Sequence, residues 1–163
     1  GKIMAMSDGV GKGSEFIVHL PIGESRNTTI PPLHEHSTEP KLSPRRILVV
    51  DDNIDAAESL SILLSMQGHI VETANNGITG FQCAGAFHPD TIILDIGLPD
   101  INGYEVARKI RNTHWGENII LIAATGWAQE KDKALAYEAG FNFHLTKPID
   151  FQQLNRFFES ILI

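Results

Sequence analysis

The sequence predicts an α/β fold, a doubly wound parallel sheet with helices on both faces, from residue 45 to the end of the chain. Short apolar runs alternate there with helical patterns, as expected of βαβ units around a parallel sheet. We expect the runs 47–50, 91–94 and 119–123 to form central strands, because they are apolar at successive positions and need cover on both faces. The more polar runs 70–74 and 142–145 should form the two edges.

Two helices of this region have a clear apolar stripe. The stripe of the first is Ala56, Ala57, Leu60, Leu63 and Leu64. This helix should end near Gly68, because glycine often terminates helices. The stripe of the second is Phe151, Leu154, Phe158 and Ile161, after the N-cap Asp150. A third helix is expected over 77–87, where glycines interrupt the pattern.

The residues before position 45 predict a different organisation. Two alternating runs, 2–6 and 15–20, flank a glycine-rich stretch and predict a β-hairpin. Two strands alone are marginal in water, so we expect this hairpin to be the edge of a larger sheet whose remainder lies upstream. Prolines and scarce large apolar residues then predict a flexible linker. The expected domains are a hairpin remnant at 1–22, the linker at 23–44 and the compact domain at 45–163.

Composition argues against two classes of function. The formal net charge is −7 and the basic residues are scattered, which argues against a nucleic-acid surface and suits cation binding. No apolar run approaches the ~20 residues needed to cross a bilayer, and the start lacks a signal-peptide pattern. We therefore expect a soluble, cytoplasmic fragment without membrane contact. The lone Cys83 cannot form an internal disulfide, and we expect it to be a small buried side chain.

Polar residues follow the central strands and the last strand, at the end where ligand sites of such sheets lie. They are Asp51, Asp52, Asp95, Thr125 and Lys147. Three carboxylates that meet there would repel unless one takes up a proton or a divalent cation neutralises them, and oxygen ligands favour Mg²⁺ or Mn²⁺. Asp95 follows the middle strand, from which it could reach both the metal and Lys147. It is the best candidate for a nucleophile that forms an acyl phosphate.

Residues 46–163 resemble a response-regulator receiver domain over their entire length. The motifs that carry the resemblance are Asp51-Asp52, Leu94-Asp95, Leu98-Pro99, Asn102-Gly103-Tyr104-Glu105, Ala124-Thr125-Gly126 and Lys147-Pro148. The resemblance implies a flavodoxin-like sheet with strand order 2-1-3-4-5. It also implies a role in two-component signal transduction, in which a phosphohistidine of a donor domain transfers its phosphoryl group to the chain with Mg²⁺ present.

The resemblance also implies which residues form the metal and phosphoryl site. Asp51 and Asp52 are expected to bind the metal, together with Asp95 and the backbone carbonyl of Gly97. Asp95 is expected to be phosphorylated, and Lys147 to contact the phosphoryl group. The chain would support only its own phosphorylation and dephosphorylation, which leaves its status as an enzyme open.

Three further positions concern the response to phosphorylation. The resemblance implies that Thr125 supplies the switch hydroxyl and that a cis peptide precedes Pro148. The chain departs from the family at His144, where a Tyr or Phe switch residue is common. Whether His144 acts as a switch is left open, while the residues expected to support phosphorylation are intact.

The leading segment resembles the last hairpin of a histidine-kinase ATP-binding domain, on the motifs 7–16 and Leu20-Pro21. This implies that the chain is the tail of a hybrid sensor kinase, with any membrane anchor of the parent lying upstream. The nucleotide-binding boxes of that family are absent from the sequence, so we expect no ATP binding. The phosphodonor would be the parent's own kinase core or a separate phosphotransfer protein, and homodimer formation is left open.

Two other functions are compatible with parts of the pattern. A Mg²⁺-dependent phosphatase of small molecules also uses an aspartyl nucleophile, but in the haloacid-dehalogenase type this residue follows the first strand in an Asp-x-Asp pattern. Here the first strand ends in Asp51-Asp52-Asn53, and no cap insertion is present. A pseudo-receiver that only binds proteins would not need the acidic set. Both alternatives are therefore disfavoured.

Overall fold

A computed structural model describes residues 1–20, 43–126 and 130–161. The chain divides into two compact units, Gly1–Pro40 and Lys41–Ile163. The predicted linker at 23–44 lies outside the described residues except for its last two.

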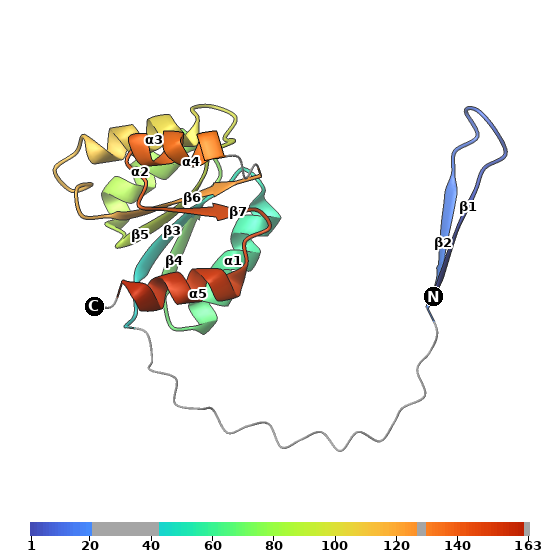
Figure 1. The fold of residues 1–163 in the computed structure, drawn as a ribbon, viewed down its shortest axis with the longest axis horizontal. Coiled ribbons are helices and arrows are strands. Elements are labelled where there is room, and N and C mark those ends of the chain that lie inside the picture. The colour runs from blue at the N-terminus through green and yellow to red at the C-terminus, as the bar shows by residue number, and fades with distance from the viewer. Residues whose placement is uncertain (21–42, 127–129, 162–163) are drawn as a thin grey trace, which may run out of the picture. The chain divides into compact units, whose positions relative to one another are not determined.

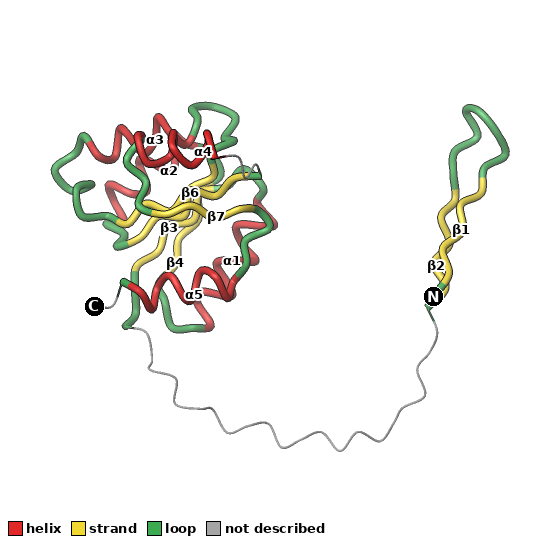
Figure 2. Tube along the Cα trace, in the orientation of Figure 1, coloured by secondary structure: helices red, strands yellow, loops and turns green. Residues whose placement is uncertain are grey.

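The second unit contains the predicted parallel sheet (Figures 1 and 2). Its strands are β3 (Arg46–Val50), β4 (Ile70–Ala74), β5 (Thr91–Asp95), β6 (Ile120–Thr125) and β7 (Phe143–Thr146). The order is β4-β3-β5-β6-β7, and all neighbours are parallel. The predicted order 2-1-3-4-5 is confirmed, with the more polar strands β4 and β7 at the edges.

Among the described residues, five helices cover the two faces of this sheet (Figure 1). They are α1 (Ile54–Met66), α2 (Gly77–Phe87), α3 (Gly103–Arg111), α4 (Glu130–Glu138) and α5 (Phe151–Ser160). Alternate residues of β3 enter opposite cores: Leu48 packs with residues of α2, α3 and α4, whereas Val49 packs with α1 and α5. Burial on both faces explains why the central strands are continuously apolar. None of the described helices has the length and apolarity needed to cross a bilayer.

Helix α2 forms over the predicted residues, and close packing explains why it contains glycines. A Cβ on Gly77 would lie 2.8 Å from Val106 Cγ2 of α3, and a Cβ on Gly80 would lie 2.8 Å from Val50 Cγ1 of β3. Glycine lowers helix propensity by about 1 kcal/mol relative to alanine. Glycine at these positions lowers helix propensity, but the absence of a Cβ allows α2 to approach β3 and α3 closely.

The first unit is an antiparallel hairpin of β1 (Lys2–Met6) and β2 (Glu15–His19). Its connection has positive φ angles at Gly9, Gly11 and Gly13, which explains the glycine-rich stretch as a turn. Phe16 on β2 is 71 % exposed. Within the described part of the chain, this hairpin has no core of its own.

Two local predictions have different outcomes. The peptide bond before Pro148 is cis, as expected. The prediction of a buried Cys83 is wrong in part, because its side chain is only half-buried and packs at the margin of the core. Its thiol donates a hydrogen bond to Glu72 Oε2 at 3.0 Å. Burial and the Glu72 carboxylate raise the pKa of the thiol to about 11, so it is protonated at neutral pH.

Candidate functional site

The carboxyl ends of the central strands bring the predicted polar residues to one rim of the sheet. Asp51 directly follows β3, Asp95 ends β5, Thr125 ends β6 and Lys147 directly follows β7. Parallel pairing sets Asp95 beside Ala124 of β6. These side chains come from segments far apart in the sequence and are gathered by strand order alone.

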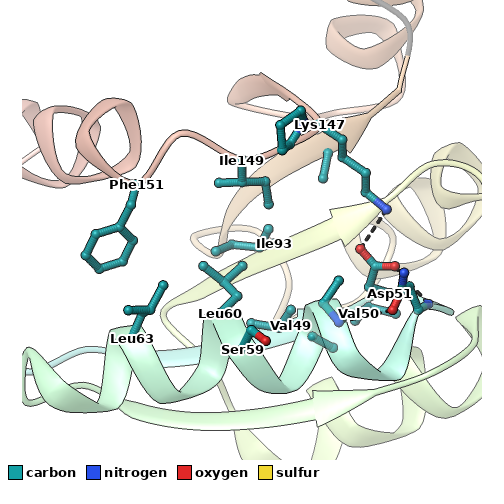
Figure 3. A pocket seen from close by; sticks show the side chains of 15 residues that line it. Val49, Val50, Asp51, Ser59, Leu60, Leu63, Ile93, Lys147, Ile149 and Phe151 are labelled. Carbon is teal, nitrogen blue, oxygen red and sulfur yellow. Dashed lines mark hydrogen bonds and ion pairs between the residues drawn. The ribbon is translucent and has the colours of Figure 1, made fainter. Parts of the chain in front are cut away.

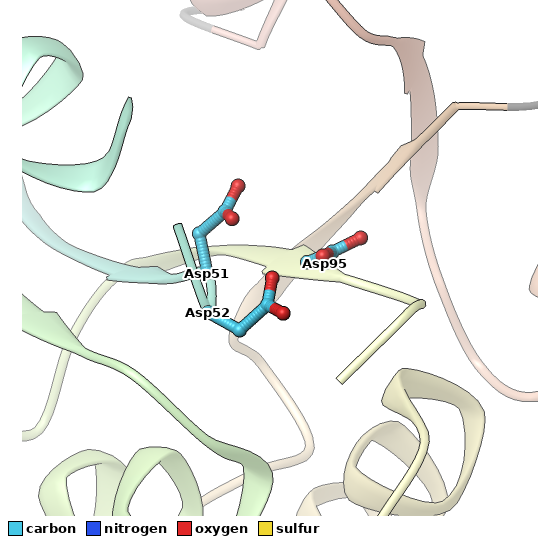
Figure 4. Close-up of side chains that lie close together, drawn as sticks. All are labelled: Asp51, Asp52 and Asp95. Atoms are coloured by element: carbon cyan, nitrogen blue, oxygen red, sulfur yellow. The ribbon is translucent and has the colours of Figure 1, made fainter. Parts of the chain in front are cut away.

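Three carboxylates form a compact acidic cluster at this rim (Figure 4). Asp51, Asp52 and Asp95 each offer an oxygen atom, and these atoms lie within 4.8 Å of one another. Asp52 is exposed, whereas Asp51 is 6 % and Asp95 7 % exposed. Like charges at this spacing repel, and burial of two of them increases the need for a cation.

Lys147 supplies one positive charge to the cluster. Its Nζ atom lies 2.6 Å from Asp51 Oδ2 and 2.9 Å from Asp95 Oδ2, and Figure 3 shows it reaching the Asp51 carboxylate. Burial lowers the pKa of the ammonium group, but hydrogen bonds and charge attraction from Asp51 and Asp95 outweigh it, so the pKa is raised. Lys147 is therefore charged, and three carboxylates with one ammonium leave two negative charges, which matches one divalent cation.

Backbone N–H groups orient the two buried carboxylates through their other oxygen atoms. Asn53 N–H donates to Asp51 Oδ1 at 3.0 Å, and Gly97 N–H donates to Asp95 Oδ1 at 3.1 Å. The side chain of Asn53 also caps α1, because its Oδ1 accepts from Ala56 N–H at 3.1 Å. The loop after each strand therefore sets the orientation of the carboxylate at the end of that strand.

A cavity of about 370 Å³ opens beside Asp95. It is lined by Asp95, Ile96, Gly97, Tyr104, Thr125, Gly126 and Lys147. Tyr104 was not assigned a role from the sequence, although it lies in one of the motifs that carry the resemblance. His144 is not among the lining residues; it is half-buried on β7, paired in register with Ala123.

A larger cavity of about 500 Å³ lies on the other side of Lys147, between α1 and α5 (Figure 3). Asp51 and Lys147 line one end of it, and apolar side chains that include Leu60, Ile149 and Phe151 line the rest. Lys147 thus lines both the smaller cavity, which also contains Asp95 and Thr125, and the larger, mainly apolar one.

The match to known proteins agrees with this geometry. The family model of the response regulator receiver domain matches residues 47–159. The chain belongs to this family. Residues 47–159 are a receiver domain of the two-component type, the class of domain that accepts a phosphoryl group.

Transcriptional regulators and a sensor kinase are among the relatives of this chain. The transcriptional regulatory protein CusR of Escherichia coli K12 is 37 % identical over 109 residues, which cover 67 % of this chain and 47 % of CusR. The chain therefore spans about half the length of such curated relatives. The autoinducer sensor kinase/phosphatase CqsS of Vibrio cholerae is 37 % identical over 127 residues, which cover 77 % of this chain and 18 % of CqsS.

A solved structure of another receiver domain has a fold similar to that of this chain. The receiver domain of the sensor histidine kinase PA1611 of Pseudomonas aeruginosa superimposes with a TM-score of 0.66 at 30 % identity, and the match covers 72 % of this chain and 97 % of the other. That structure has a magnesium ion coordinated in its active site cleft.

Proposed function

We propose that Asp95 accepts the phosphoryl group of a phosphohistidine, with Mg²⁺ held by Asp51, Asp52, Asp95 and the Gly97 carbonyl, in the receiver domain of a hybrid sensor kinase. One observation carries the assignment to Asp95. Of the three clustered carboxylates, Asp95 alone lines the cavity that Thr125 and Lys147 also line. A phosphoryl group bound in that cavity would meet a nucleophile, a hydroxyl and an ammonium group.

The donor set of the cluster fits Mg²⁺. Carboxylate and carbonyl oxygens are the ligands that this ion prefers, with water and phosphate oxygens completing the octahedron. The net charge of the cluster with Lys147 also favours a divalent cation. A bound Mg²⁺ would supply positive charge to the oxygens of the phosphoryl group during transfer. Mn²⁺ satisfies the same requirements.

The transfer step uses the buried carboxylate as nucleophile. An oxygen of Asp95 attacks phosphorus, the phosphorus–nitrogen bond of the phosphohistidine breaks, and the imidazole leaves with the bonding electron pair and takes up a proton. The product is an acyl phosphate on Asp95. Lys147 lies 2.9 Å from Asp95 Oδ2, where its charge can stabilise the transferring group.

The response to phosphorylation is assigned to the neighbouring residues. A phosphoryl group adds about −1.5 to −2 charge and new acceptor oxygens. Thr125 is 6 % exposed and lines the same cavity, so its hydroxyl is the switch group that approaches these oxygens. Movement of Thr125 would shift the region of helix α4. His144 on the neighbouring strand is the candidate second switch residue.

Two observations support the hybrid-kinase context and the domain division at 1–22, 23–44 and 45–163. The sensor kinase CqsS and the receiver domain of the sensor histidine kinase PA1611 are both similar to this chain. The hairpin also exposes large apolar side chains, as expected of the edge of a sheet continued by other residues. The donor would be the parent's kinase core or a separate phosphotransfer protein in the cytoplasm.

Intact-protein mass spectrometry tests the proposed function. Incubation with Mg²⁺ and acetyl phosphate should add one phosphoryl group to the native chain and none to Asp95→Asn. Unchanged phosphorylation of Asp95→Asn would contradict the assignment. Steady turnover of phosphate esters would instead support a phosphatase, and the absence of any mass increase with native protein would support a pseudo-receiver.

A further inference from the structure

One carboxylate joins the loop after β5 to the start of helix α2. Asp100 lies in this loop, residues 96–102, and its Oδ1 and Oδ2 atoms accept hydrogen bonds from the backbone N–H groups of Gly77 and Ile78, both at 2.8 Å. These are the first two residues of α2, whose N–H groups have no partner within the helix. Asp100 therefore attaches the loop to α2 through two charge-assisted hydrogen bonds at the positive end of the helix dipole.

Packing brings the same loop and helix into close contact. A Cβ on Gly77 would lie 2.6 Å from Ile101 Cγ1 and 2.7 Å from the Ile101 carbonyl oxygen. Leu98 of the loop is buried, and Ile101 packs at the margin of the same core. The hydrogen bonds of Asp100 thus hold together two segments that glycine allows to touch.

The other end of the loop contacts the phosphoacceptor. Gly97 N–H donates to Asp95 Oδ1 at 3.1 Å, and Gly97 lines the cavity beside Asp95. At the start of α3, Gly103 N–H donates to the Ile96 carbonyl at 3.0 Å, which closes the loop on itself. A loop that moved away from α2 would therefore displace Gly97 from the Asp95 carboxylate.

We propose that Asp100 is a positioning residue: by fixing the 96–102 loop on α2, it holds Gly97 in place for the metal and phosphoryl site. The inference rests on the proposed function, in which the Gly97 carbonyl is a metal ligand. Loss of a group that orients a metal ligand typically lowers metal affinity 10–100-fold, and we expect about tenfold here because Asp100 acts through the backbone.

Calorimetric titration of the 163-residue chain with Mg²⁺ tests the proposal. Asn76→Ala is the matched control, because Asn76 Oδ1 caps the same helix at Thr79 N–H, 2.8 Å away. Both Asp100→Ala and Asn76→Ala should lower thermal stability. Only Asp100→Ala should weaken Mg²⁺ binding about tenfold, with Asn76→Ala within about twofold of the native protein. Asp100→Asn, which keeps one acceptor oxygen, should lie between Asp100→Ala and the native protein.

Amide hydrogen exchange without metal gives a second readout that does not depend on the proposed function. Asp100→Ala should accelerate exchange at Gly97 and Gly103, and Asn76→Ala should not. If Asp100→Ala does not fold, Asp100→Asn is measured in its place. Equal Mg²⁺ affinity in the variant and native proteins, or equal loss in both variants, would overturn the proposal. Failure of the native chain to bind Mg²⁺ would contradict the proposed function, and the exchange data would still decide the role of Asp100.

Discussion

Replacement of Gly103 by alanine should destabilise the domain and disturb the phosphoacceptor together. Gly103 is the first residue of α3, and its Cα faces the backbone of β5 and the following loop. An added Cβ would clash with the Asp95 carbonyl oxygen and would lie 2.8 Å from Ile96 Cα. Neither atom belongs to a flexible side chain, so the β5–α3 connection itself must move.

The size of the effect follows from these contacts. Overpacking of a well-packed site costs about 1–3 kcal/mol, and backbone neighbours place Gly103→Ala at the upper end of that range. The higher helix propensity of alanine offsets up to about 1 kcal/mol. We therefore expect a net loss of about 2 kcal/mol, which corresponds to about 8 °C in the melting temperature of a domain of this size.

Thermal unfolding followed by circular dichroism measures this loss. Gly85→Ala in α2 is the matched control, because a Cβ at Gly85 would lie at an ordinary van der Waals distance, 3.5 Å, from Trp115 Cζ2. It should leave stability unchanged or raise it by up to about 1 kcal/mol through the helix propensity of alanine. If Gly103→Ala were as stable as Gly85→Ala and took up phosphate equally well, the close approach of α3 to Asp95 would be refuted.

Three further predictions address charge, switching and pH. Lys147→Met should tighten Mg²⁺ binding, because it removes the positive charge that lies 2.6 Å from Asp51 Oδ2. The same substitution should slow phosphoryl uptake from acetyl phosphate. Weaker Mg²⁺ binding in calorimetry would contradict the expected effect on the metal. Thr125→Ala should take up phosphate normally but show a weaker response of α4, measured by NMR with beryllofluoride. The response should be weakened and not abolished, because one charge-assisted hydrogen bond contributes only about 1.5–3 kcal/mol of the about 5.5 kcal/mol that a full two-state shift requires. Complete loss of phosphate uptake would argue against a role of Thr125 as a switch. Burial and then the Arg45 charge lower the pKa of His69, so the unfolded chain binds its proton more readily, and stability should fall as pH drops below about 6.5. Chemical unfolding should show that the free energy of unfolding falls less between pH 8 and pH 5 in His69→Asn than in the native protein. Equal pH dependence in the two proteins would exclude His69 as the cause.

The strands and the core of the site were predictable from the sequence because both depend on local patterns. Continuous apolar runs identify strands buried on both faces, and the residues at their carboxyl ends must share one rim. This is sufficient to bring Asp51, Asp95, Thr125 and Lys147 together. The sequence could not show that the Lys147 ammonium group contacts both buried carboxylates, which the structure does.

Features that depend on contacts between distant segments were not predictable. The glycines at 77 and 80 weaken the helical pattern of α2, and only the proximity of Ile101 and Val50 explains them. Helix α3 has an apolar stripe of Val106, Ala107 and Ile110 that was available in the sequence and was not used, whereas the nine residues of α4 show little separation of apolar from polar positions. Asp100 caps a helix that begins 23 residues earlier, a relation with no periodic signal in the sequence.

The location of the phosphoryl group is the most direct test of the central claim. Borohydride reduction of the phosphorylated chain converts an aspartyl phosphate to homoserine, and peptide mapping by tandem mass spectrometry identifies the position. We predict that the change occurs at Asp95 alone. Reduction at Asp51 or Asp52 instead, with Asp95 unmodified, would contradict the account of the site.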